Sequence, residues 1–260
     1  MQSQEPSAME HPVGDRGPSP ALNTSALAVL AGVFTVSTIA YLPLAWYLSL
    51  EHGIGIAAAM LLLAIFALVF NGLQHHRYQS FGQANTITAA RAAMVSLVAA
   101  AVFYPPATQS IANAPWSFVI LVLLALALDG LDGHLARRYG QESNLGARFD
   151  MEIDALLILC LSAAGYFLGK AGAWILLIGL MRYGFVLAQY WLPRLGGELQ
   201  PSQRRKLVCV GQVAALCAIL MPFVNAPISS WIAGFALLLL SYSFSVDCLY
   251  LLSETREEEQ

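Results

Sequence analysis

The sequence predicts an all-α protein, a polytopic transmembrane helical bundle of about eight helices. Hydrophobic residues make up 58% of the 260 positions and charged residues only 11%, which is too apolar for a soluble domain. The apolar residues gather in eight segments, each near the ~20 residues that a helix needs to cross a bilayer. With a net charge of −3 and few basic residues, no nucleic-acid partner is expected.

The eight helices are expected in the following order along the chain. They lie at about 25–50, 54–73, 86–104, 116–136, 145–168, 172–192, 207–224 and 231–252. Residues 1–24 contain prolines, glycines and mixed charges without periodicity, so we expect a disordered cytoplasmic N-terminal tail. Residues 254–260 form an acidic C-terminal tail.

Lysine and arginine indicate the orientation in the membrane. Of the 13 basic residues, eleven fall in alternate loops, or at helix ends beside them, that share one side with both termini. Lys170 lies on the opposite side, and Arg182 lies within a helix. The positive-inside rule then puts both termini and segment 129–154 on the cytoplasmic face. We expect an integral, multi-pass protein of the bacterial cytoplasmic (inner) membrane.

Four aspartates gather where the fourth and fifth helices meet the membrane surface. Asp129 and Asp132 share one helix face with Gly133 and Ala136, at i, i+3, i+4 and i+7. Gly146, Asp150 and Asp154 share a face of the next helix, whereas Glu152 points elsewhere. The link between these helices is short, which predicts antiparallel neighbours with both carboxylate pairs facing one cytoplasmic cavity.

Carboxylates at a membrane are costly unless they are paired, so this cluster predicts a bound cation. Oxygen ligands without His or Cys suit a hard cation such as Mg²⁺ or Mn²⁺. Magnesium typically shares a few carboxylates with substrate phosphates, which predicts a phosphate-containing substrate. The small residues Gly133 and Ala136 let a bulky ligand approach the backbone, although small residues on membrane helices also serve helix packing.

The acidic segment resembles the signature of the CDP-alcohol phosphatidyltransferase family. The run Asp129-x2-Asp132-Gly133-x2-Ala136-Arg137-x8-Gly146-x3-Asp150-x3-Asp154 matches every fixed position of that signature. The resemblance implies six core helices, cleavage of a CDP-linked donor with release of CMP, and a homodimer. Residues 25–83 would then be an additional N-terminal transmembrane hairpin, and residues 84–253 the family core.

The same resemblance implies roles for the residues of the signature. Asp129, Asp132 and Asp150 would hold two divalent cations, and Asp154 would deprotonate the acceptor hydroxyl. The CDP moiety would be accommodated by Gly133, Ala136 and Arg137, while Gly146 would allow close approach between the helices.

A second stretch, Asn85-x2-Thr88-x2-Arg91, looks like the opening of the first core helix in many relatives. The resemblance places Asn85 and Thr88 near CDP and makes Arg91 a candidate for binding phosphate. The alternative is a helix cap followed by an arginine that snorkels to the interface.

Four further basic residues are candidates for binding a phosphorylated acceptor: Arg182, Arg204, Arg205 and Lys206. Arg182 lies inside a predicted membrane helix, where a guanidinium should face the bundle interior or a wet cavity. The 204–206 cluster, expected in the loop beyond the sixth helix, also fits a role in topology or in binding anionic lipid headgroups.

Several functions stay open. The first is metal-dependent transfer of a phosphatidyl group from CDP-diacylglycerol to a small polar alcohol, in phospholipid biosynthesis. If Arg182 and its neighbours hold a phosphate, a phosphorylated acceptor such as glycerol 3-phosphate is favoured. The alternative enzyme transfers a CDP-bound headgroup alcohol to diacylglycerol. A cation-coupled transporter and an intramembrane aspartate-rich prenyltransferase are the remaining classes, since acidic residues in bundles also mark ion pathways.

Overall fold

The computed structural model describes residues 20–47, 52–73, 81–103, 116, 118–128, 144–192 and 202–258. The described parts are helical and contain no strand, which confirms the predicted all-α bundle. The helices are α1 (Pro20–Tyr47), α2 (His52–Gly72), α3 (Gln83–Phe103), Phe118–Leu128, α6 (Asn144–Phe167), the short η2 (Ala173–Ile175), α7 (Leu176–Trp191), α8 (Gln203–Leu220) and α9 (Ile228–Glu258).

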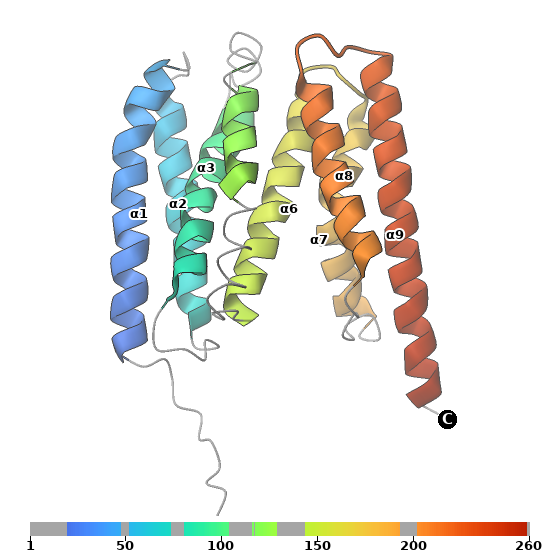
Figure 1. Cartoon of the computed structure of the whole chain (residues 1–260), viewed down its shortest axis with the longest axis horizontal. Helices are drawn as coiled ribbons and strands as arrows, with labels where there is room; N and C mark the ends of the chain where they lie inside the picture. Colours follow the sequence, from blue (N-terminus) through green and yellow to red (C-terminus); the bar gives the residue numbers. More distant parts are fainter. Residues whose placement is uncertain are drawn as a thin grey trace, which may run out of the picture.

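The helices stand side by side, and the two described connections, from α6 to α7 and from α8 to α9, lie at the same end of the bundle (Figure 1). The start of α1 and the end of α9 lie at the same end, as expected when both termini share one side of a membrane. Helix α3 packs against α1, α2 and α6, and α6 also packs against α7 and α8. These two helices therefore form the centre of the bundle, and α3 is the most buried of the long apolar helices.

Five helices in the described residues are long and apolar enough to cross a membrane. Their apolar parts are Leu22–Leu44, Gly53–Gly72, Asn85–Phe103, Ala173–Trp191 and Ile228–Leu251. This supports a multi-pass membrane protein. Each of the eight predicted crossings has a helix, but α6 and α8 carry several charged residues in their first turns and so fall outside this apolar set. The described helix Phe118–Leu128 is apolar but shorter.

Several helix boundaries differ from the sequence prediction, three of them in charged or terminal segments. Helix α1 begins at Pro20, within the predicted tail, because the fixed φ of proline suits the first position of a helix. Helix α9 continues to Glu258, so most of the predicted acidic tail is helical. Helix α8 begins at Gln203, which places Arg204, Arg205 and Lys206 in its first turn and not in a loop.

At the other end of the bundle, Lys170 joins two connections. Gly169 has a φ of +66°, a left-handed conformation that favours glycine and ends α6. The next residue, Lys170, is buried, and its Nζ donates to the Val224 carbonyl at 2.6 Å and to Asn225 Oδ1 at 2.8 Å. Ser229 donates in turn to the Lys170 carbonyl. Burial lowers the pKa of the Lys170 amine, because it disfavours the charged form. The hydrogen bonds to the surrounding oxygens offset part of the free-energy cost of burying this charge.

We expect Lys170→Met to destabilise the fold, because the substitution leaves the oxygens around Nζ without their charged donor. Hydrogen bonds to charged groups are each worth roughly 1.5–3 kcal/mol, so we expect a loss of about 2 kcal/mol in the free energy of unfolding. The thermal unfolding midpoint in detergent checks this, with exposed Arg148→Met on α6 as the control. Equal midpoints for the two variants would contradict the role of Lys170.

Candidate active site

The first turns of α6 carry the second half of the acidic signature. Gly146, Asp150 and Asp154 lie on one continuous helix, and Gly146 is in its first turn. The Asp150 and Asp154 side chains are 36% and 33% exposed, so a ligand can reach both carboxylates. Phe149 and Ile153, each directly before one of these aspartates in the sequence, are buried and anchor α6 in the core. One face of α6 therefore leaves the two carboxylates accessible to a ligand, while another face packs in the core of the bundle.

Arg91 of α3 bridges these two aspartates. It is fully buried, and its Nη2 lies 2.5 Å from Asp150 Oδ1 and 3.0 Å from Asp154 Oδ1. The same nitrogen lies 3.2 Å from the Asp150 backbone carbonyl. The guanidinium therefore does not snorkel to the interface, in contrast to one of the two readings of its sequence. Arg91 thus joins α3 to both carboxylates of α6.

Asn85 and Thr88 lie on the same helix as Arg91, at the two preceding positions of the motif. Both are buried, and Asn85 Nδ2 donates to the Phe81 carbonyl at 2.5 Å. This bond joins Asn85 to the segment that precedes α3, as a residue near a helix start often does. The motif thus runs along the buried side of α3 towards the aspartates of α6.

Five residues of the signature lie outside the described residues: Asp129, Asp132, Gly133, Ala136 and Arg137. Their sequence assignments stay predictions. Within the described part of the chain, no group of three His, Cys, Asp or Glu side chains is close enough together to hold a metal ion. The described donors, Asp150 and Asp154, are carboxylates, the ligand type that Mg²⁺ and Mn²⁺ prefer.

A cavity of about 590 Å³ lies beside Asp154, between α6, α7, α8 and α9. Arg182 of α7 and Arg205 of α8 line it, together with Ser243 and Asp247 of α9. The rest of its lining is largely apolar. The cavity therefore brings one carboxylate of the signature together with two of the five basic residues predicted to bind phosphate.

Arg204 has a different environment from Arg205. Its guanidinium bonds to the Asp247 carboxylate, and its Nη1 lies 3.1 Å from the Ser243 carbonyl. Arg204 thus joins the start of α8 to α9, which offsets the unfavourable position of a cation at a helix N-terminus. The side chain of Lys206 is not among those that the structure describes.

Two features of the cavity were not predicted from the sequence. A Cβ added to Gly179 of α7 would lie 2.5 Å from the Leu159 Cα of α6, so only glycine permits this close approach. One helical turn further along α7, Arg182 reaches back to α6, where its Nη2 lies 2.6 Å from Glu152 Oε1. Glu152 therefore fixes the position of a cavity arginine. The sequence offered one signal for this contact, the negative charge of Glu152 between Asp150 and Asp154 of the signature.

The fold and these contacts define a multi-pass membrane protein with a charged site built around one acidic helix. The family model for CDP-alcohol phosphatidyltransferase matches residues 81–245, more than half of the chain, and the protein belongs to this family. Neither the curated proteins nor the solved structures include a significant match. Family membership implies transfer of a phosphatidyl group from a CDP-linked alcohol to another alcohol, which favours an enzyme over a transporter.

Proposed function

We propose that the protein is a metal-dependent phosphatidyltransferase of phospholipid biosynthesis. It transfers the phosphatidyl group of CDP-diacylglycerol to a small phosphorylated alcohol, such as glycerol 3-phosphate, and releases CMP. The observation that carries this proposal is the cavity that contains Asp154, Arg182 and Arg205 together. Two arginines beside a candidate base suit an acceptor that carries both a phosphate and a hydroxyl.

In the proposed reaction the acceptor hydroxyl attacks the phosphorus that carries diacylglycerol. The new bond forms between the acceptor oxygen and this phosphorus, the bond to CMP breaks, and CMP leaves with the electron pair. Asp154 takes the proton of the hydroxyl as the new bond forms. The acceptor needs such a base because an ordinary alcohol barely ionises near neutral pH. Arg91, held against Asp150 and Asp154, positions both carboxylates for this chemistry.

The remaining signature residues would bind the donor and its metals. Asp129, Asp132 and Asp150 would hold two divalent cations, either Mg²⁺ or Mn²⁺. When bound, such cations neutralise charge on the attacking and leaving oxygens of a phosphoryl transfer. The CDP moiety would lie against Gly133, Ala136 and Arg137, near Asn85 and Thr88. By the positive-inside rule this site faces the cytoplasm, and by family resemblance the protein is a homodimer.

The direct test is CMP release by the purified protein from CDP-diacylglycerol. The acceptors are glycerol 3-phosphate, inositol phosphate, inositol and serine, each with Mg²⁺ or Mn²⁺ and again after chelation with EDTA. We expect turnover with a phosphorylated acceptor and loss of turnover in EDTA. Turnover only with CDP-ethanolamine or CDP-choline and diacylglycerol would show that the lipid is the acceptor and the headgroup alcohol the CDP-linked donor. Inactivity with every CDP-linked donor would refute the enzyme proposal.

Arg182→Gln tests the acceptor site. We expect kcat/KM for the phosphorylated acceptor to fall roughly 10- to 100-fold, because a hydrogen bond to a charged group is worth about 1.5–3 kcal/mol. Turnover with an acceptor that lacks phosphate should change little. Exposed Arg148→Gln is the matched control, since it removes a cation outside the cavity. An equal loss for both kinds of acceptor would show that Arg182 has no part in recognising phosphate.

A further inference from the structure

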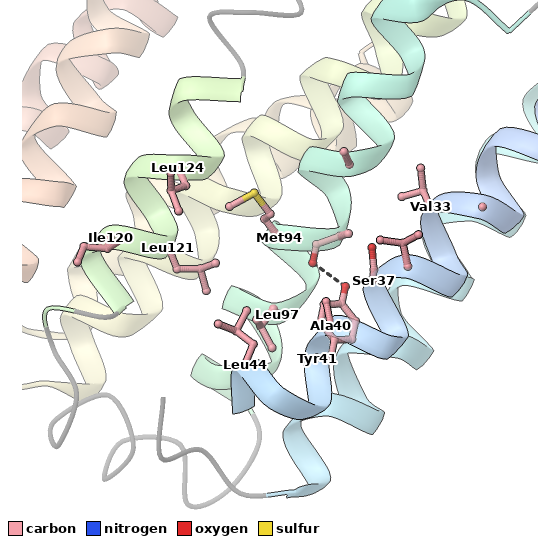
Figure 2. Close-up of a pocket in the computed structure, with 14 residues that line it drawn as sticks. Val33, Ser37, Ala40, Tyr41, Leu44, Met94, Leu97, Ile120, Leu121 and Leu124 are labelled. Atoms are coloured by element: carbon pink, nitrogen blue, oxygen red, sulfur yellow. Dashed lines mark hydrogen bonds between the residues drawn. The ribbon is translucent and has the colours of Figure 1, made fainter. Parts of the chain in front are cut away.

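A second cavity, of about 630 Å³, lies on the other side of the bundle from α7 and α8, between α1, α3 and the helix Phe118–Leu128 (Figure 2). Its volume falls within the ~300–1,000 Å³ of ordinary ligand pockets. Side chains from all three helices point into it, among them Val33 of α1, Met94 of α3 and Leu121. The described residues that line it include neither Asp150 and Asp154 nor Arg182 and Arg205, so it is distinct from the cavity beside Asp154.

The lining of this cavity, which we call the α1–α3 cavity, is almost wholly hydrocarbon. Ser37 and Tyr41 are its only polar lining residues among the described parts of the chain. The Tyr41 hydroxyl donates its hydrogen to the Ala93 carbonyl at 2.7 Å, and the ring itself is buried (Figure 2). None of the lining residues that the structure describes carries a formal charge at neutral pH. The occupant that fits such a lining is an apolar chain.

The cavity lies within the membrane-spanning part of the protein and opens towards the bilayer. Its α1 and α3 residues fall inside the apolar spans Leu22–Leu44 and Asn85–Phe103. Val36, Ile120 and Leu124 line it and are each more than half exposed. A hollow at this depth adjoins lipid chains on its open side. An acyl chain can therefore enter sideways without crossing water.

Helix α3 connects this cavity to the candidate active site. Ala90, Ala93, Met94 and Leu97 form one face of α3 along the cavity, over about 10 Å of helix axis. Arg91 follows Ala90 directly and reaches Asp150 and Asp154 on α6. The same turn of α3 therefore contains Ala90, which lines one end of the cavity, and Arg91, which contacts both aspartates. A lipid whose headgroup binds at the aspartates has its chains within reach of the cavity.

We propose that the α1–α3 cavity binds an acyl chain of the diacylglycerol-bearing substrate. This inference rests on the proposed function, and it holds whether that lipid is donor or acceptor, because both candidate reactions use diacylglycerol. The wall formed by α1 lies outside residues 81–245, which the family model matches. The additional N-terminal hairpin thus acquires a role, that of completing a chain-binding site against the family core.

Two substitutions fill the cavity from α1. A Cβ added at Gly32 meets no atom within 4 Å, so Gly32→Phe has room to enter the hollow without displacing backbone. Ala40→Phe fills it from further along the helix. Ala31→Phe is the matched control, because Ala31 is exposed, adjoins Gly32 and does not line the cavity. All three variants add a phenyl group to the same helix.

The experiment compares CDP-dioleoylglycerol with CDP-dihexanoylglycerol in CMP release, for the wild type and each variant. A chain gains little hydrophobic free energy on moving from bilayer to protein, so the expected effect is steric exclusion. We expect kcat/KM for the dioleoyl donor to fall roughly tenfold in Gly32→Phe and Ala40→Phe, as for a ligand that no longer fits its pocket. The dihexanoyl donor, whose chains are too short to fill the cavity, should be turned over at the wild-type rate by every variant.

The short-chain donor also reports whether each variant is folded. Wild-type kinetics of both cavity variants with dioleoyl donor would overturn the proposal and leave the cavity to bulk lipid or to a second copy of the chain. An equal loss with both donors would also overturn it, because the damage would then be to the fold. If the wild type releases CMP from neither donor and from no headgroup donor, the proposed function itself has failed.

Discussion

Asp154→Asn is expected to lower the rate of CMP release roughly a thousandfold, within the ~10²–10⁴-fold contribution of a general base. Asparagine has nearly the shape of aspartate, and its carbonyl oxygen can still accept the hydrogen bond that Arg91 donates to Asp154 Oδ1 at 3.0 Å. The variant should therefore fold like the wild type and lack only the group that takes the proton.

The pH dependence of the variant separates a base from a structural residue. If Asp154 removes the proton, solvent hydroxide replaces it in the asparagine variant, and the residual rate rises with pH. Asp247→Asn is the control, because Asp247 lines the same cavity and bonds to Arg204. We expect the control to stay within about tenfold of the wild type, since it touches the acceptor side alone. A pH-independent residual rate for Asp154→Asn would assign Asp154 a structural role.

The local parts of this architecture could be predicted from the sequence. Helix positions follow from apolar segments of the length that a bilayer requires, and α6 carries Asp150 and Asp154 with helical spacing as predicted. The family could be predicted too, because its signature occupies one short segment with fixed spacing. These features depend on residues close together in the chain, so no knowledge of the tertiary packing was needed.

Contacts between distant helices could not be predicted in the same way. Arg91 and Asp150 are separated by 59 residues, and only the packing of α3 against α6 brings them together. The close approach at Gly179 depends on which faces α6 and α7 turn towards each other, and only the packing of the two helices defines this. The start of α8 was misplaced because three adjacent cations resemble a loop, whereas Arg204 is held on the helix by Asp247.

Arg91→Met is the substitution for which we expect the largest combined loss of stability and activity. Methionine retains much of the buried volume of arginine but leaves the Asp150 and Asp154 carboxylates facing each other without the guanidinium. Removing one partner of a buried ion pair typically costs about 3–5 kcal/mol, and the lower value applies here because both carboxylates are a third exposed. We therefore expect the free energy of unfolding of Arg91→Met to be about 3 kcal/mol lower than that of the wild type.

Turnover should fall at least roughly a hundredfold in Arg91→Met, because a displacement of catalytic groups by about 1 Å can cost that much. Arg91→Lys should recover part of the stability and little of the activity, since a single ammonium cannot reproduce the position of Nη2 between two carboxylates. Thermal unfolding and CMP release are measured for both variants, with exposed Arg148→Met as the control. If Arg91→Lys were as active as the wild type, charge alone would matter and the positioning role of the guanidinium would be refuted.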